Sequence, residues 1–161
     1  MNTQIKLDIV EINNSFIQVS GSSTSFVNIR NISKVDTQEL LDKVRSISKM
    51  ARQQGIKVLR KNKTLASIRE NMASYEKAVE EYQSLFNKVK TLTEEKVEKG
   101  IFYGFSDDKE LSEISSLCHK MQTMNHRSQP ISVIHSILHS VYHMEEHIKH
   151  NKNSTIVSLG F

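Results

Sequence analysis

The chain has 161 residues, of which 37% are hydrophobic, so it can form one compact domain, or one domain with an appendage, around a thin core. Its single cysteine, Cys118, excludes an intramolecular disulfide, and no apolar stretch approaches the roughly 18 residues of a membrane-spanning helix. The formal net charge of +4 is mild, so the distribution of charge matters more than its total.

Residues 1–35 are rich in Ser, Asn and Ile and poor in charge. Ile5, Leu7 and Ile9 alternate with polar residues, which is the periodicity of a strand. Two or three short strands are one interpretation, and a flexible leader is the other, because so small a β unit is marginal by itself. No basic start followed by an apolar run marks a signal peptide. We therefore expect a cytoplasmic protein, or one exported without a classical signal.

A long helical segment is predicted over residues 36–99. Asp36 and Glu39 have the spacing of a capping box at its start. From Leu40 to Val89, apolar residues recur at alternating steps of four and three, which is the heptad spacing of a coiled coil. The sequence thus predicts one long heptad helix in this range, or two helices in the same register.

The two-helix alternative is a hairpin of helices near 36–60 and 64–99. Gln54, Gly55 and Lys61 interrupt the heptad spacing, and Lys61-Asn62-Lys63-Thr64 is typical of a turn. Both alternatives leave an apolar seam along the second part of the segment. As a hypothesis, we assign self-association to this seam, which consists of Leu65, Ile68, Met72, Tyr75, Val79, Tyr82 and Phe86.

Residues 100–150 follow with an apolar loop and two shorter amphipathic helices that we expect to pack on the long segment. The second helix begins near Pro130. Residues 151–161 form an apolar tail that either lies on a helical face or docks elsewhere. The loop either packs on the helix ends or binds a partner, because aromatic residues dominate binding hot spots. Its candidate partner-binding residues are Ile101, Phe102, Tyr103 and Phe105.

Nine Lys and Arg residues and no acidic residue lie between Asp42 and Glu70. Three interpretations follow: pairing of this basic helix with the acidic stretch 70–98, binding of an anionic protein or membrane surface, or binding of nucleic acid by the segment 43–69. The candidate contacts for an anionic partner are Lys49, Arg52, Lys57, Arg60, Lys61 and Lys63.

Five histidines recur at helical spacing between His135 and His150, on the side away from the apolar residues of that helix. A solvated histidine-rich face is the simplest interpretation, and a pH-sensitive surface or a weak metal site are the others. The segment His143-Met144-Glu145-Glu146-His147 matches H-x-x-E-H, but no further ligand lies well downstream. The weak metal-binding candidates are His139, His143, Glu146 and His147.

The sequence contains no glycine-rich phosphate loop, C-x-x-C pair or G-x-S-x-G turn, and Cys118 falls on an apolar helix face, where a buried thiol is expected. We expect no cofactor and no enzymatic activity. The predicted fold is all-α: an antiparallel helical bundle or coiled-coil hairpin built on the long heptad helix, with an irregular or short-β N-terminal segment. The predicted function is a non-catalytic assembly, adaptor or scaffolding role through protein–protein contacts. The alternatives are a bacterial effector or type III export substrate with an N-terminal leader, and a nucleic-acid-associated protein.

Overall fold

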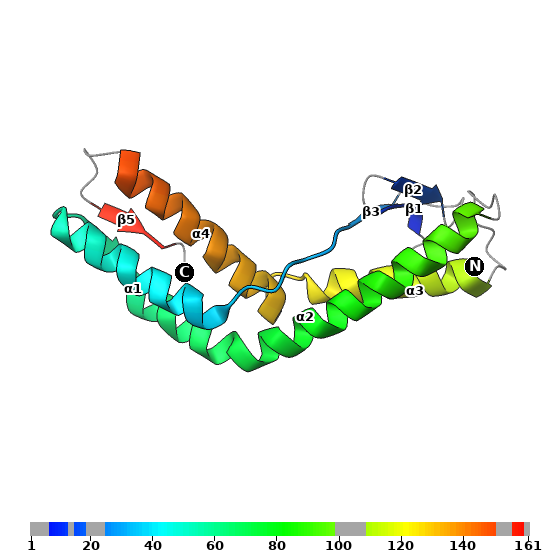
Figure 1. Ribbon diagram of the computed structural model, residues 1–161, viewed down its shortest axis with the longest axis horizontal. Helices are drawn as coiled ribbons and strands as arrows, with labels where there is room; N and C mark the ends of the chain where they lie inside the picture. The colour runs from blue at the N-terminus through cyan, green and yellow to red at the C-terminus, as the bar shows by residue number, and fades with distance from the viewer. Residues whose placement is uncertain (1–6, 13–14, 19–24, 99–108, 151–155, 160–161) are drawn as a thin grey trace, which may run out of the picture. The chain divides into compact units, whose positions relative to one another are not determined.

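A computed structural model describes residues 7–12, 15–18, 25–98, 109–150 and 156–159 of the chain. The protein is mostly helical, as predicted (Figure 1). The helices are α1 (Thr37–Gln53), α2 (Lys61–Glu98), α3 (Lys109–Met124) and α4 (Pro130–His150). The strands are β1 (Leu7–Ile12), β2 (Ser15–Gln18), β3 (Ser25–Ile29), β4 (Lys57–Leu59) and β5 (Ile156–Ser158).

The chain divides into two compact units that both include part of α2. Unit 1 comprises Met1–Ser33 and Val79–Asn125, and unit 2 comprises Lys34–Ala78 and residues 126–161. In unit 1, a three-stranded sheet has the order β2-β1-β3, with β1 antiparallel to β2 and parallel to β3. Ion pairs Lys88–Glu113 (3.0 Å) and Lys120–Glu81 (2.9 Å) join α2 to α3.

Residues 36–99 are not one helix, so the single-helix alternative is wrong. The chain leaves α1 after Gln53 and enters α2 at Lys61, and Lys61-Asn62-Lys63-Thr64 forms the first turn of α2 rather than a turn between helices. The break lies earlier, at Gly55, whose φ is +73°. The N–H of Gly55 donates to the Arg52 carbonyl (3.0 Å), and the N–H of Ile56 donates to the Ala51 carbonyl (2.8 Å). These two bonds make a Schellman ending, in which a left-handed glycine terminates the helix.

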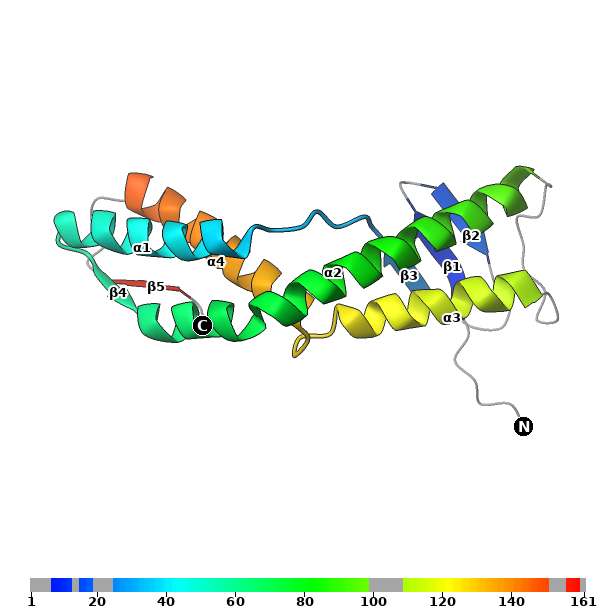
Figure 2. The same cartoon turned by 60° about the horizontal axis from the view of Figure 1, so that its bottom comes forward.

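In unit 2, the core lies between the apolar stripes of α1 and α4 and the start of α2. The stripe of α4 is buried at Ile131, Ile134, Ile137, Val141, Met144 and Ile148. A two-stranded parallel sheet, β4-β5, completes this unit, with Val58 paired to Val157 (Figure 2). Of the predicted apolar tail, Ile156–Ser158 therefore pairs with a strand between α1 and α2, and Val157 and Leu159 are buried.

Two buried tyrosines of α2 hydrogen-bond the chain that connects β3 to α1. In unit 1, the Tyr82 hydroxyl donates to the Arg30 carbonyl (3.0 Å) and Gln83 Nε2 donates to the Ile32 carbonyl (2.9 Å). In unit 2, the Val35 N–H donates to the Tyr75 hydroxyl (2.9 Å). Each tyrosine thus buries its ring and satisfies its hydroxyl on the backbone of the connection.

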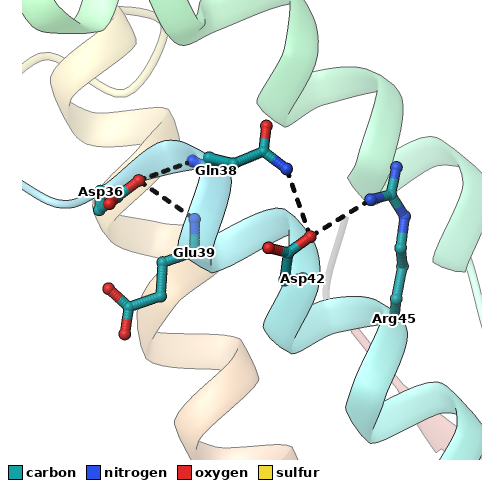
Figure 3. A network of polar contacts seen from close by, with 5 residues as sticks. All are labelled: Asp36, Gln38, Glu39, Asp42 and Arg45. Carbon is teal, nitrogen blue, oxygen red and sulfur yellow. Dashed lines mark hydrogen bonds and ion pairs between the residues drawn. The ribbon is translucent and has the colours of Figure 1, made fainter.

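Asp36 caps α1, as its position in the sequence predicts (Figure 3). Its Oδ1 accepts from the backbone N–H groups of Gln38 (3.0 Å) and Glu39 (3.1 Å). We expect Asp36→Ala to lower the free energy of unfolding by about 1 kcal/mol, because two N–H groups at the helix start lose their acceptor. Urea denaturation measures this change.

The matched control is Asp42→Ala, one turn further along α1. Asp42 contacts only the side chains of Gln38 (3.3 Å) and Arg45 (3.4 Å), all of them exposed (Figure 3). Its removal should cost less than about 0.5 kcal/mol. Equal losses in the two variants would show that the cap contributes nothing beyond an exposed carboxylate.

Candidate anionic-partner surface

Charge is divided unequally between the two units. Unit 2 contains fourteen Lys and Arg against seven Asp and Glu, a formal charge of +7, whereas unit 1 contains eight against eleven, a charge of −3. The mild net charge of the whole chain therefore conceals a strongly basic unit. Such a unit attracts anions at a distance of about one Debye length, which is roughly 8 Å at physiological salt.

The excess is concentrated where α1 ends and α2 begins. We call Lys49, Arg52, Lys57, Arg60, Lys61 and Lys63 the basic surface. Lys49 and Arg52 lie on α1, Lys57 lies on β4, and the other three lie at or just before the first turn of α2. Lys61 is half-buried and the remaining five are exposed. In Figures 1 and 2 the end of α1 and the start of α2 lie at the same end of unit 2.

Within the described part of the chain, none of these six side chains forms an ion pair. Among the described residues of one chain, these six side chains therefore form no ion pair with the acidic stretch 70–98, and their pairing with that stretch across a dimer stays a prediction. Glu81 of that stretch pairs with Lys120 of α3 in unit 1, and Glu76 approaches Lys34 at 4.0 Å.

The position of these charges is unfavourable for folding. The N-terminus of a helix carries a partial positive charge, so acidic residues stabilise it and basic residues destabilise it. The first turn of α2 has no acidic residue and contains Lys61 and Lys63. Arg60, directly before it, adopts a φ of +63°, a left-handed conformation that non-glycine residues rarely adopt. The missing acidic residue, the two lysines and the left-handed Arg60 are thus all unfavourable for the start of α2. Locally unfavourable residues of this kind are often found at functional sites.

Lys43 is a basic residue of α1 that pairs with another helix of unit 2, whereas Arg45 pairs with Asp42 within α1. Lys43 Nζ lies 2.9 Å from Glu145 Oε2 of α4 and 4.5 Å from the centre of the Tyr142 ring. Lys149 Nζ donates to the other oxygen of Glu145 (3.0 Å). These hydrogen bonds lower the pKa of Glu145, and the bond to Glu145 raises the pKa of Lys43. This cluster joins α1 to α4 and is separate from the basic surface.

The seam hypothesised for self-association is internal. Leu65, Ile68, Tyr75, Val79, Tyr82 and Phe86 are buried within a single chain, and only Met72 is half-buried. The heptad spacing correctly identified the residues, because burial along α2 follows the same steps of three and four. A second copy could reach these side chains only by displacing the chain's own packing. We therefore assign the seam to the core of this protein.

The aromatic loop candidates Ile101, Phe102, Tyr103 and Phe105 lie outside the described residues. Of the histidines, His139, His143 and His150 are exposed, as predicted. His135 is not on the open face. Its Nε2 lies 3.4 Å from the Tyr75 hydroxyl, and burial lowers the pKa of its imidazole. Its position, one turn after the buried Ile131, places it at the edge of the core.

The weak metal candidates do not form a site. His139 and His143 are exposed, His147 is half-buried, and Glu146 Oε2 lies 3.0 Å from His150 Nε2. Among the described residues, no group of three or more His, Cys, Asp and Glu side chains is arranged to hold a metal ion. The described helices also include none that is long and apolar enough to cross a bilayer.

Cys118 is fully buried in unit 1, as its position on an apolar helix face predicts. Burial raises the pKa of its thiol to about 12, because the thiolate is poorly solvated in an apolar environment. This thiol therefore packs in the core of unit 1, where burial favours its protonated form.

Three structural features had no signal that we recognised in the sequence. They are the β4-β5 pairing, the Lys43–Glu145–Lys149 cluster and the tyrosine hydrogen bonds to the connection before α1. Each joins residues that are far apart in the chain, and a single sequence does not reveal such pairs.

Comparison with known proteins assigns no family: no family model matches the chain, and neither a curated protein nor a solved structure is significantly similar to it.

The unfavourable charge at the start of α2 predicts that Lys61→Glu stabilises the protein. We expect a gain of about 0.5 kcal/mol in the free energy of unfolding at low ionic strength, from a favourable interaction with the helix N-terminus. The gain should shrink as salt is added. Arg69→Glu is the control, because Arg69 is exposed on the same helix but lies beyond the first turn. Equal effects of the two substitutions in urea titrations would contradict the electrostatic explanation.

The buried thiol predicts slow chemical labelling. With a pKa of about 12, roughly one thiol in ten thousand is ionised at pH 8. We expect an aromatic disulfide reagent to label Cys118 at a rate limited by opening of the structure, and to label it rapidly in urea. Labelling of the native protein at the rate of the unfolded protein would show that the thiol is accessible.

Proposed function

We propose that this chain is a non-catalytic helical interaction protein that binds an anionic protein partner through the basic surface. One observation carries the proposal: six cations gathered around the end of α1 and the start of α2 form no ion pair with any described residue. They lie in a unit with a formal charge of +7, so neighbouring charges reinforce rather than cancel their attraction for an anion.

The folding physics supports the same proposal. Acidic residues in the first turn stabilise a helix, but the start of α2 has Arg60, Lys61 and Lys63 instead. An anion that binds there would offset the repulsion among these residues. We also propose that α1 and the first part of α2 associate as an antiparallel hairpin, which would hold the two halves of the basic surface together. The support for this is the heptad spacing of buried residues on both helices.

Nucleic acid is the second candidate partner, because exposed cations also neutralise phosphates. On α1, Arg45, Lys49 and Arg52 follow one another at helical spacing on one exposed face. The basic surface has no aromatic side chain on which a base could stack. A duplex would therefore be bound through its backbone, with an affinity that falls steeply with salt and does not depend on sequence.

The test is elution from heparin, a polyanion that probes any such surface. Lys49→Glu/Lys57→Glu/Lys63→Glu reverses three exposed charges of the basic surface. The control Lys77→Glu/Lys90→Glu/Arg127→Glu makes the same change in net charge at three exposed positions elsewhere. We expect the first variant to elute at much lower salt than the control, because only it removes the cluster. Equal elution of the two variants would show that net charge alone governs binding, and would overturn the proposal.

A further inference from the structure

The β4-β5 sheet presents one face to solvent. In a parallel pair, residues that are opposite one another lie on the same face, and successive residues alternate. The register pairs Lys57 with Ile156 and Leu59 with Ser158, so these four residues share a face, while Val58 and Val157 share the other. Val157 is 9% exposed, whereas Leu59 is 38% and Ile156 58% exposed. We call the face of Lys57, Leu59, Ile156 and Ser158 the outer face.

The outer face is unusual in its apolar content. Among the described residues, the large hydrophobic side chains that are exposed are Leu59, Ile156 and Tyr142, and the first two lie on this one small sheet. Single exposed apolar residues are common on protein surfaces, whereas contiguous apolar patches mark interaction sites.

Three residues of the basic surface lie next to the apolar pair in the sheet or in the chain. Lys57 lies on the same face and opposite Ile156, and Arg60 and Lys61 follow Leu59 directly in the chain. A ligand of the outer face therefore has to provide anionic groups for the cations and apolar groups that cover Leu59 and Ile156. Phosphates of a nucleic acid need only the cations, and neither Leu59 nor Ile156 can stack on a base. A membrane surface gains little from two partly buried aliphatic residues.

We propose that the outer face and its flanking cations bind an acidic segment of a protein partner that carries aliphatic side chains among its carboxylates. The carboxylates meet Lys57, Arg60 and Lys61, and the aliphatic groups cover Leu59 and Ile156. This inference rests on the proposed function, to which it adds the apolar contact and the chemistry of the partner. Charge complementarity determines where the segment binds, and the aliphatic contact distinguishes it from other polyanions.

The test uses the full chain and two labelled synthetic peptides of equal length and equal negative charge. One contains only Glu, Ser and Gly, and in the other Leu replaces some of the Ser. Fluorescence anisotropy measures both affinities. We expect the Leu-containing peptide to bind roughly tenfold more tightly, since covering two aliphatic side chains removes apolar area from water. Leu59→Ser/Ile156→Ser should abolish this difference and leave the affinity for the Glu-Ser-Gly peptide unchanged.

Tyr142→Ser is the matched control, because Tyr142 is exposed (53%) but lies on α4 and is not part of the outer face. It should leave both affinities unchanged. Thermal melts of the variants establish that they are folded. If both peptides bind wild-type protein equally, the aliphatic contact is refuted and the proposed function stands. If neither binds and Lys49→Glu/Lys57→Glu/Lys63→Glu behaves as wild type on heparin, the proposed function fails with it.

Two further probes separate the other occupants. A DNA duplex that binds more tightly than either peptide, and equally to Leu59→Ser/Ile156→Ser, would assign the surface to nucleic acid and overturn the inference. Phosphatidylserine vesicles that bind wild-type protein but not this variant, while both peptides fail to bind, would assign it to a lipid surface and likewise overturn it.

Discussion

The burial of one apolar stripe along α2 is the constraint on which the rest of the structure depends. The stripe follows heptad spacing from Leu65 to Val89 and is buried first in unit 2 and then in unit 1. Its two tyrosines also hold the connection before α1 through their hydroxyl groups. Since burying an aromatic ring removes a large apolar area from water, these positions dominate the stability of both units. Because this stripe is buried inside the chain, it offers little apolar surface for binding a partner.

What remains on the surface of unit 2 is mainly charge. Lys43 of α1 is neutralised by Glu145, but the basic surface around the end of α1 and the start of α2 is not neutralised by described residues. Lys61 and Lys63 stand at a helix N-terminus, where they oppose the helix dipole. A fold stabilised by its buried stripe can tolerate this local cost. Under the proposed function, an anion bound at this helix start would offset the repulsion among its cations.

Local signals in the sequence predicted local structure well. Asp36 and Pro130 correctly indicated where α1 and α4 begin, heptad spacing identified the buried side of α2, and Cys118 was expected in the core. The break between α1 and α2 was placed too late, because Lys61-Asn62-Lys63-Thr64 resembles a turn. Gly55 was noted only as an interruption, although a glycine followed by a buried Ile56 is the usual signature of a Schellman ending.

The features that the sequence could not predict depend on pairs distant in the chain. The β4-β5 sheet joins residues 57–59 to residues 156–158, and each strand is too short to show a periodicity. His135 was expected on the open face, but its neighbour Tyr75, sixty residues away, brings it to the edge of the core. For the candidate site, the run of basic residues in the sequence was sufficient to predict all six cations. It could not show that these cations form no ion pair with described residues, nor that Leu59 and Ile156 share a face of the β4-β5 sheet.

The most direct test of this account is the mass of the protein in solution. If the stripe of α2 is consumed inside one chain, light scattering coupled to size exclusion should give the 18.5 kDa of a monomer at low and at high salt. A dimer that persists at both salt concentrations and dissociates when Phe86 is replaced by Ser would contradict the account. It would show that the stripe joins two copies, and that the chain does not bury it alone.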